Sequence, residues 1–110
     1  MSRIVQLEAL VAELYEQKHE GRADWADWLY EHHVSVVADY ATKLAKKYDA
    51  NGEYARAAAL LHDIADAVIA RSDPSHETRS VEIARSLLAQ CEYSQGEIAL
   101  IVDDAIMFHS

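Results

Sequence analysis

The chain has 110 residues, a length at which one domain with a single hydrophobic core is expected. Apolar residues make up 51% of the chain, which has only three glycines and one proline, and this composition favours helices. Nineteen acidic residues against ten basic ones give a net charge of −9, which argues against a broad nucleic-acid-binding face and against binding to anionic membranes.

The N-terminus and the cysteine content indicate the cellular compartment. The first residues lack the basic-then-apolar pattern of a secretory signal, and no apolar run approaches membrane-spanning length. The single cysteine, Cys91, excludes an internal disulfide and is expected to be a buried thiol. We therefore predict a soluble cytoplasmic protein with no membrane partner.

Two amphipathic helices are predicted in the first half of the chain. Residues 2–20 carry apolar side chains at three- and four-residue spacing, which is typical of a helix with one buried face. A second helix is predicted over residues 25–48. Its expected buried stripe consists of Leu29, Val36, Val37, Tyr40, Ala41, Leu44 and Tyr48.

Two adjacent histidines on the second helix are expected to occupy different faces. His33 is four residues from both Leu29 and Val37, so it should point into the apolar face. His32 is seven residues before Asp39, on a face that also carries lysines, so it should be exposed to solvent. A histidine on an apolar face is either satisfied by a backbone carbonyl or bound to a ligand, and both interpretations of His33 stay open at this point.

A turn signal at residues 51–52 precedes a third helix, predicted over residues 53–70. This run is apolar and rich in alanine, yet it contains His62, Asp63 and Asp66 at spacings that allow the three side chains to share one face. Burying imidazole and carboxylate groups is costly unless each finds a partner. A divalent metal ion is one such partner, and solvent or a neighbouring hydrogen bond at a polar helix edge is the other.

Two further helices complete a predicted all-α compact bundle of about five helices. A loop over residues 71–75 contains the proline, and His76 then opens a fourth helix. A neutral His76 there would suit a metal ion or a phosphate, whereas a charged one is disfavoured by the helix dipole. Ser94 and Glu97 form a capping box that starts the fifth helix, and the apolar face of that helix extends to His109.

The order of these residues resembles the HD superfamily of metal-dependent phosphohydrolases. Its members carry a histidine on one helix, a His-Asp pair on a later helix and an aspartate further downstream. The matching stretches are residues 31–41 (EHHVSVVADYA), 60–66 (LLHDIAD), 75–84 (SHETRSVEIA) and 106–109 (IMFH). The resemblance covers about residues 25–110 and implies a single HD-type helical domain over residues 1–110, with residues 2–20 as its N-terminal helix.

The resemblance also implies the chemistry. His33, His62 and Asp63 would bind a divalent metal ion, for which manganese, iron, magnesium, zinc, cobalt and nickel are all candidates. His76 and His109 match positions that bind a second metal ion or the substrate phosphate in some members of the family. The implied substrate is a nucleotide or another small phosphomonoester or phosphodiester, hydrolysed by a metal-activated water with Asp63 as a catalytic carboxylate. Asp66 is a second candidate catalytic carboxylate on chemical grounds, because a carboxylate there could orient the water or fix the tautomer of a histidine.

Two departures from the family pattern bear on activity. Asp66 stands where the related HD-GYP phosphodiesterases carry a lysine. The closing aspartate of the family normally follows the helix that holds His109, whereas this sequence ends at Ser110, so we expect the chain to lack the C-terminal part of the family domain. A regulatory or interaction domain with the HD fold and little activity is therefore the alternative to an enzyme. A second copy of the chain, in a homodimer, is among the expected partners.

Overall fold

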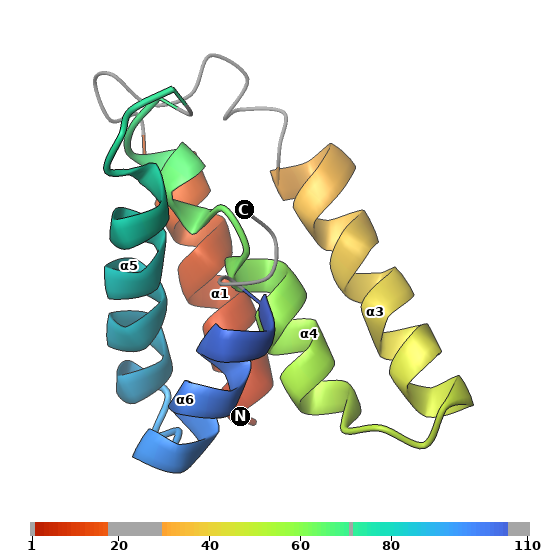
Figure 1. Cartoon of the computed structure of the whole chain (residues 1–110). Coiled ribbons are helices and arrows are strands. Elements are labelled where there is room, and N and C mark those ends of the chain that lie inside the picture. Colours follow the sequence, from red (N-terminus) through yellow and green to blue (C-terminus); the bar gives the residue numbers. More distant parts are fainter. Residues whose placement is uncertain (1, 18–29, 71, 106–110) are drawn as a thin grey trace.

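Helices account for every regular element in the described part of the chain, which is residues 2–17, 30–70 and 72–105 of a computed structural model (Figure 1). The all-α fold predicted from the sequence is confirmed. The α-helices are α1 (Arg3–Glu16), α3 (Ser35–Lys47), α4 (Gly52–Leu61), α5 (His76–Gln90) and α6 (Gln95–Ala105). A π-helical turn, η1 (Tyr30–Val34), leads into α3, and a 3-10 turn, η2 (Ile64–Ala67), follows α4.

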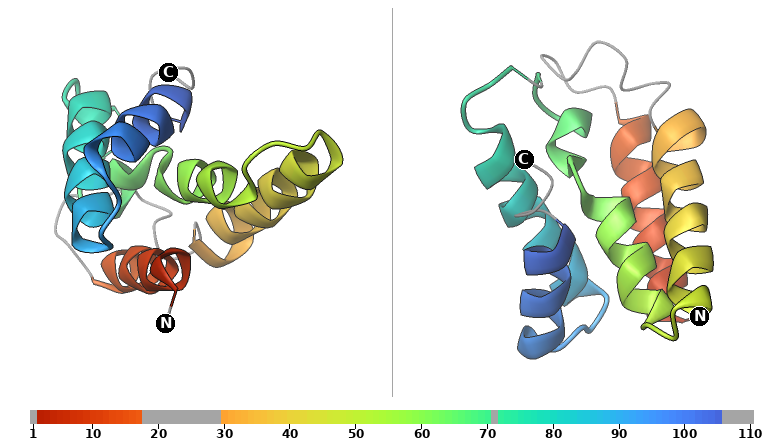
Figure 2. Two further views of the ribbon diagram at one scale, coloured as in Figure 1. Left: turned by 90° about the horizontal axis from the view of Figure 1, so that it is seen from below. Right: turned by 45° about the vertical axis from the view of Figure 1, so that its right-hand side comes forward.

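α4 is the central helix of the bundle. It packs against α3 on one side and against α1 and α6 on the other, while α5 packs against α6, α1 and η2. Figure 2 shows α3 and α4 as an antiparallel hairpin, with α3 at the edge of the molecule. None of the described helices is long and apolar enough to cross a membrane. Because α4 contacts α3, α1 and α6, and η2 contacts α5 and α1, the end of α4 and the turn η2 lie where the hairpin meets the other three helices.

The core is formed by apolar side chains that these helices turn inward. Its largest fully buried members are Leu7, Val11, Val34, Leu60, Leu61, Ile64, Leu88, Ile101 and Val102. Cys91 is buried among them, as predicted, and burial raises the pKa of its thiol. The large buried side chains therefore come from α1, α4, α5, α6 and the turns η1 and η2, whereas the buried residues of α3 are the alanines Ala38 and Ala45.

The first helix is shorter than predicted. Ser2 caps α1, since its hydroxyl accepts a hydrogen bond from the N–H of Val5. The helix ends at Glu16 because Gln17 has an extended backbone. The second predicted helix begins at Tyr30 in the described part of the chain and ends at Lys47, one residue before its expected end.

The predicted buried stripe of the second helix is wrong at four positions: Val36, Tyr40, Leu44 and Tyr48 are exposed. Val37 and Ala41 are partly buried against the core, and Leu29 lies outside the described residues. The buried side of α3 carries Ala38 and Ala45 instead, facing an alanine-rich α4. Small side chains on both helices allow a close approach of the two backbones, so the small face of α3 is buried and the bulky one is left outside.

Glu97 ties three helices together. Arg3 of α1 donates hydrogen bonds to Glu97 (Nη1–Oε1 2.9 Å) and to Glu53 of α4 (Nε–Oε2 2.7 Å). The Tyr54 hydroxyl donates to Glu97 Oε2 at 2.6 Å. Glu97 also completes the predicted capping box with Ser94, through backbone N–H bonds of 2.9 and 3.2 Å in the two directions.

This cluster should make stability depend on pH. Hydrogen bonds from Arg3, Tyr54 and Ser94, in that order of effect, hold the pKa of the Glu97 carboxyl well below its usual value of 4.5. A pKa lowered in the folded state stabilises the fold above the ordinary pKa, and this stabilisation is lost as the pH falls below that value. We expect Glu97→Gln to lower Tm at neutral pH and to reduce the further fall in Tm towards about pH 3, measured by circular dichroism. Glu16→Gln, at an exposed position, is the control, and identical acid profiles for the two variants would contradict the expectation.

Candidate metal centre

The predicted third helix is interrupted where its histidine and aspartate lie. α4 ends at Leu61, His62 follows with an extended backbone, and Asp63 adopts the left-handed conformation at φ 55° and ψ 26°. Aspartate is one of the few residues other than glycine that adopt this conformation readily. The prediction of one continuous helix over residues 53–70, with His62, Asp63 and Asp66 on one face, is therefore wrong.

Two hydrogen bonds hold the turn that replaces the helix. The N–H of Asp66 donates to the carbonyl oxygen of Asp63 at 2.9 Å, and the N–H of Ala65 donates to Ser80 Oγ at 3.0 Å. Ser80 lies on α5 and is only 1% exposed. Sequence reasoning missed this residue, although it is four positions after His76 and therefore shares its face of α5, a spacing that could have identified it.

Ser80→Ala should destabilise the protein because it leaves the buried N–H of Ala65 without its acceptor. The expected loss in free energy of unfolding is about 1–3 kcal/mol, measured by urea denaturation. Ser86→Ala on the same helix is the matched control, since the Ser86 side chain is exposed and should cost little. Equally small losses for the two variants would show that the Ser80 hydroxyl does not hold the turn.

The turn brings His62 next to His33. The two rings lie with their centroids 5.7 Å apart and their planes at 62°, His33 coming from η1 and His62 from the end of α4. The antiparallel packing of α3 on α4 places these two helix ends together. His32, by contrast, has a side chain that is 54% exposed, and its Nε2 lies 4.0 Å from Glu31.

The orientation of the His62 ring is fixed by a backbone carbonyl. Its Nδ1 lies 2.6 Å from the carbonyl oxygen of Ala59. A carbonyl oxygen can only accept, so Nδ1 carries a proton, and in the neutral imidazole Nε2 then carries the lone pair. Metal-binding imidazoles are commonly held in this way, with one ring nitrogen donating to an oxygen and the other binding the metal.

Asp66 and His76 form a second pair. Asp66 is 1% exposed, and its Oδ1 lies 2.7 Å from Nε2 of His76, whose side chain is 12% exposed. The carboxylate accepts and Nε2–H donates, so Asp66 orients the imidazole. With Nε2 engaged, His76 could reach a metal ion or a phosphate only through Nδ1.

The five predicted metal ligands are therefore brought together only in part. Among the residues that the structure describes, no three His, Cys, Asp or Glu side chains are grouped closely enough to hold a metal ion. The rings of His33 and His62 lie next to each other, and Asp63 follows His62 directly in the sequence, whereas His76 is paired with Asp66. His109 lies outside the described residues.

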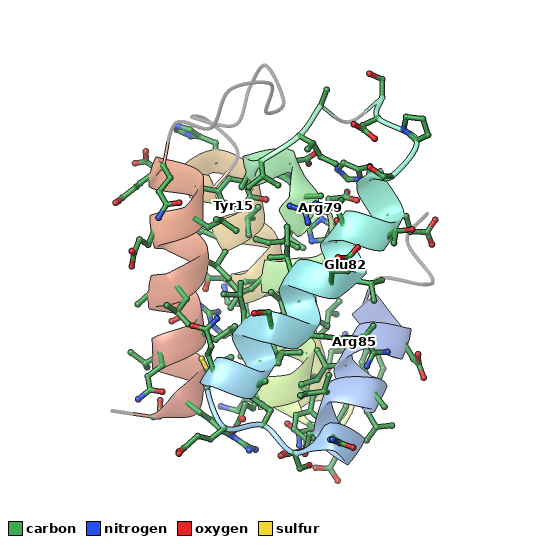
Figure 3. All side chains as sticks on the ribbon, turned by 90° about the vertical axis from the view of Figure 1, so that its left-hand side faces the viewer. Tyr15, Arg79, Glu82 and Arg85 are labelled. Atoms are coloured by element: carbon green, nitrogen blue, oxygen red, sulfur yellow. The ribbon has the colours of Figure 1, made fainter. Side chains whose placement is uncertain are left out.

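A cavity of about 370 Å³ opens between α1 and α5, away from the histidine pair. Arg79 and Glu82 on α5 are charged residues of its lining, and Arg79 Nη1 lies 3.9 Å from Glu82 Oε2 (Figure 3). The lining residues are Leu14, Val68, Arg79, Glu82, Ile83, Ser86 and Leu87. None of the predicted site residues lines this cavity, so the cavity is not part of the candidate metal centre.

Comparison with known proteins identifies the family. The HD domain family matches residues 30–110, a range that begins at η1 and includes His33, His62 and Asp63. No curated protein and no solved structure matches the chain. The family match covers most of the chain and contains the two histidines that the fold brings into contact, so this protein belongs to the HD domain family.

Proposed function

We propose that the protein is a metal-dependent phosphohydrolase that acts on a nucleotide or another small phosphorylated compound. HD domain proteins are typically phosphohydrolases that bind divalent metal ions and act on phosphorylated compounds. The observation that carries the proposal is the approach of the His33 and His62 rings to 5.7 Å, with the His62 tautomer fixed by the carbonyl of Ala59.

In this proposal His33 and His62 would bind a divalent ion through ring nitrogens. Asp63, whose carboxylate is not grouped with the two rings in this structure, would join them as the third ligand when the ion binds. An ion held by these residues would supply Lewis acidity, which would neutralise charge on a phosphoryl oxygen and make water more acidic. Imidazole and carboxylate donors suit manganese, iron, zinc, cobalt and nickel, and magnesium is retained for its affinity for phosphate and carboxylate oxygens. The site is set in a chain of net charge −9, so the ion would also supply the local positive charge that an anionic substrate needs.

His76, held by Asp66, is proposed to accept the proton of the attacking water. Asp66 accepts the hydrogen bond from Nε2–H of His76, which leaves Nδ1 as the nitrogen that can accept a proton from the attacking water. The buried carboxylate then stabilises the imidazolium that forms. In this proposal Asp66 positions the His76 ring and does not itself contact the substrate. An aspartate can then take the place of the lysine that related enzymes carry, because its role is a different one.

A hydrolysis assay tests the proposal. The full chain is incubated with nucleoside mono-, di- and triphosphates and with simple phosphodiesters, each with one of the six candidate metals. We expect phosphate release that a chelator abolishes and that one added metal restores. Absence of turnover with every substrate and every metal would overturn the proposal.

A regulatory or interaction domain with little activity is the second candidate. The observation that favours it is that the described residues do not group three metal-binding side chains. Thermal stability measured with the same compounds separates the two candidates. A phosphorylated compound that raises Tm without being hydrolysed would support the regulatory domain, whereas turnover would support the enzyme.

A further inference from the structure

α3 carries a bulky apolar ridge on its exposed side. Val36, Tyr40, Leu44 and Tyr48 are spaced four residues apart, so they follow one another along the helix, and they are 58, 63, 38 and 71% exposed. They make up most of the large hydrophobic side chains that are exposed in the described part of the chain. The others, Val5 and Leu100, lie singly on α1 and α6. An aligned apolar ridge of this kind indicates a surface that another molecule covers.

Two other parts of the α3 surface already face neighbours within the chain. Ala38 and Ala45 face the core next to α4. Asp39 and Thr42 receive hydrogen bonds from Arg56 of α4, at 2.8 and 3.3 Å from its Nη1. Figure 2 shows the α3–α4 hairpin projecting from the other helices, so the outer side of α3 is accessible to a second molecule.

We propose that this ridge is the contact of a homodimer in which α3 packs antiparallel against α3 of a second copy. The ridge is self-complementary about a two-fold axis at the level of residue 42. Tyr40 then meets the partner's Leu44, and Val36 meets the partner's Tyr48. A contact of this kind is isologous and closes at two copies. Ridges with a four-residue repeat also pack into each other's grooves in the commonest class of helix crossing, at about −50°.

The charges on α3 favour the same partner and the same orientation. Asp39 lies in the N-terminal half of the helix, whereas Lys43, Lys46 and Lys47 lie in the C-terminal half. Asp39 is bound by Arg56 but keeps 61% of its side chain exposed, and antiparallel pairing places it at the level of the partner's lysines. The dipoles of two antiparallel helices also oppose each other, which is favourable. Parallel pairing would place lysines opposite lysines. The contact involves one helix per copy, so we expect a weak, concentration-dependent dimer.

Sedimentation velocity of the full chain over a range of concentrations tests the interface. We expect a reversible monomer–dimer equilibrium that Leu44→Glu weakens by about tenfold or more, because it places a carboxylate against the partner's Tyr40 on each side of the axis. Leu100→Glu is the matched control at an exposed leucine on α6, and circular dichroism shows whether both variants are folded. A chain that is monomeric at every concentration, or a dimer that the two variants affect equally, overturns the proposal.

Cross-linking tests the orientation. Val36→Cys and Tyr48→Cys chains are treated with a short bis-maleimide, separately and mixed, while the native Cys91 is buried. We expect the mixture to cross-link more efficiently than either variant by itself, because antiparallel helices bring position 36 to position 48 of the other copy. Efficient cross-linking of each variant with itself and not in the mixture would show parallel helices and overturn the proposed geometry.

Discussion

Replacing His62 with alanine should abolish divalent-metal binding and hydrolysis together, whereas replacing His32 should change neither. His62 lies against His33 with its ring orientation fixed by Ala59, so its removal would take away one of the two adjacent nitrogen ligands that we propose. His32 neighbours His33 in sequence but is largely exposed. Isothermal titration calorimetry with Mn²⁺ and the phosphate-release assay measure the two effects.

His33→Ala provides the matched comparison. It should behave like His62→Ala, because both imidazoles are proposed to bind the same ion. Asp63→Ala should do the same, since Asp63 is the proposed third ligand. Equal losses from the His32 and His33 substitutions would show that the two faces of this helix have been assigned wrongly.

Replacing Asp66 with alanine should destabilise the fold more than the same replacement of an exposed aspartate or glutamate. Asp66 is fully buried, and its removal leaves His76 without the acceptor of its Nε2–H. The expected cost in free energy of unfolding is about 2–5 kcal/mol at neutral pH, measured by urea denaturation. Hydrolysis should fall as well under conditions where the variant is still folded, because the imidazole loses its orientation.

Asp103→Ala is the control for this change, since Asp103 is exposed on α6 and should cost little. Asp66→Asn separates shape from charge, because it keeps an oxygen acceptor and removes the carboxylate. An Asp66→Asn variant with full stability and full turnover would show that the negative charge beside His76 is not needed.

The parts of the fold that depend on local signals could be predicted from the sequence. Apolar spacing identified the helices, Ser94 with Glu97 marked the start of α6, and His76 marked the start of α5. The solvent exposure of His32 also followed from helical periodicity. These features depend on residues within a few positions of one another, and periodicity and capping report directly on that range.

The errors arise where distant segments decide the structure. Periodicity selected Val36 and Tyr40 as core residues, but close packing of alanines on α3 and α4 buried the other face. The helix expected over residues 53–70 is interrupted at Asp63, and in the turn that follows the N–H of Ala65 donates a hydrogen bond to Ser80 Oγ of α5. The pattern within residues 25–48 does not show that α4 packs against α3, and the pattern within residues 53–70 does not show that Ala65 bonds to Ser80.

The candidate site divides in the same way. Because His33 and His62 lie on apolar stretches of successive predicted helices, these two helices are expected to pack together, and the two rings are in contact. The pairing of Asp66 with His76 depends on how α5 docks on η2, and local spacing gives no information about that docking. The homodimer expected from the sequence likewise gains a candidate surface only when the exposed side of α3 is known.

His33 and His62 are proposed to hold one divalent ion between them, and a Mn²⁺ titration followed by NMR of ¹⁵N-labelled histidine rings tests this most directly. Paramagnetic broadening by Mn²⁺ falls steeply with distance, so it reports which rings lie at the ion. The ring signals of His33 and His62 should broaden together at substoichiometric Mn²⁺ and recover with chelator, while the signals of His32 persist. Broadening of His32 first, or of only one ring of the pair, would contradict a shared metal site.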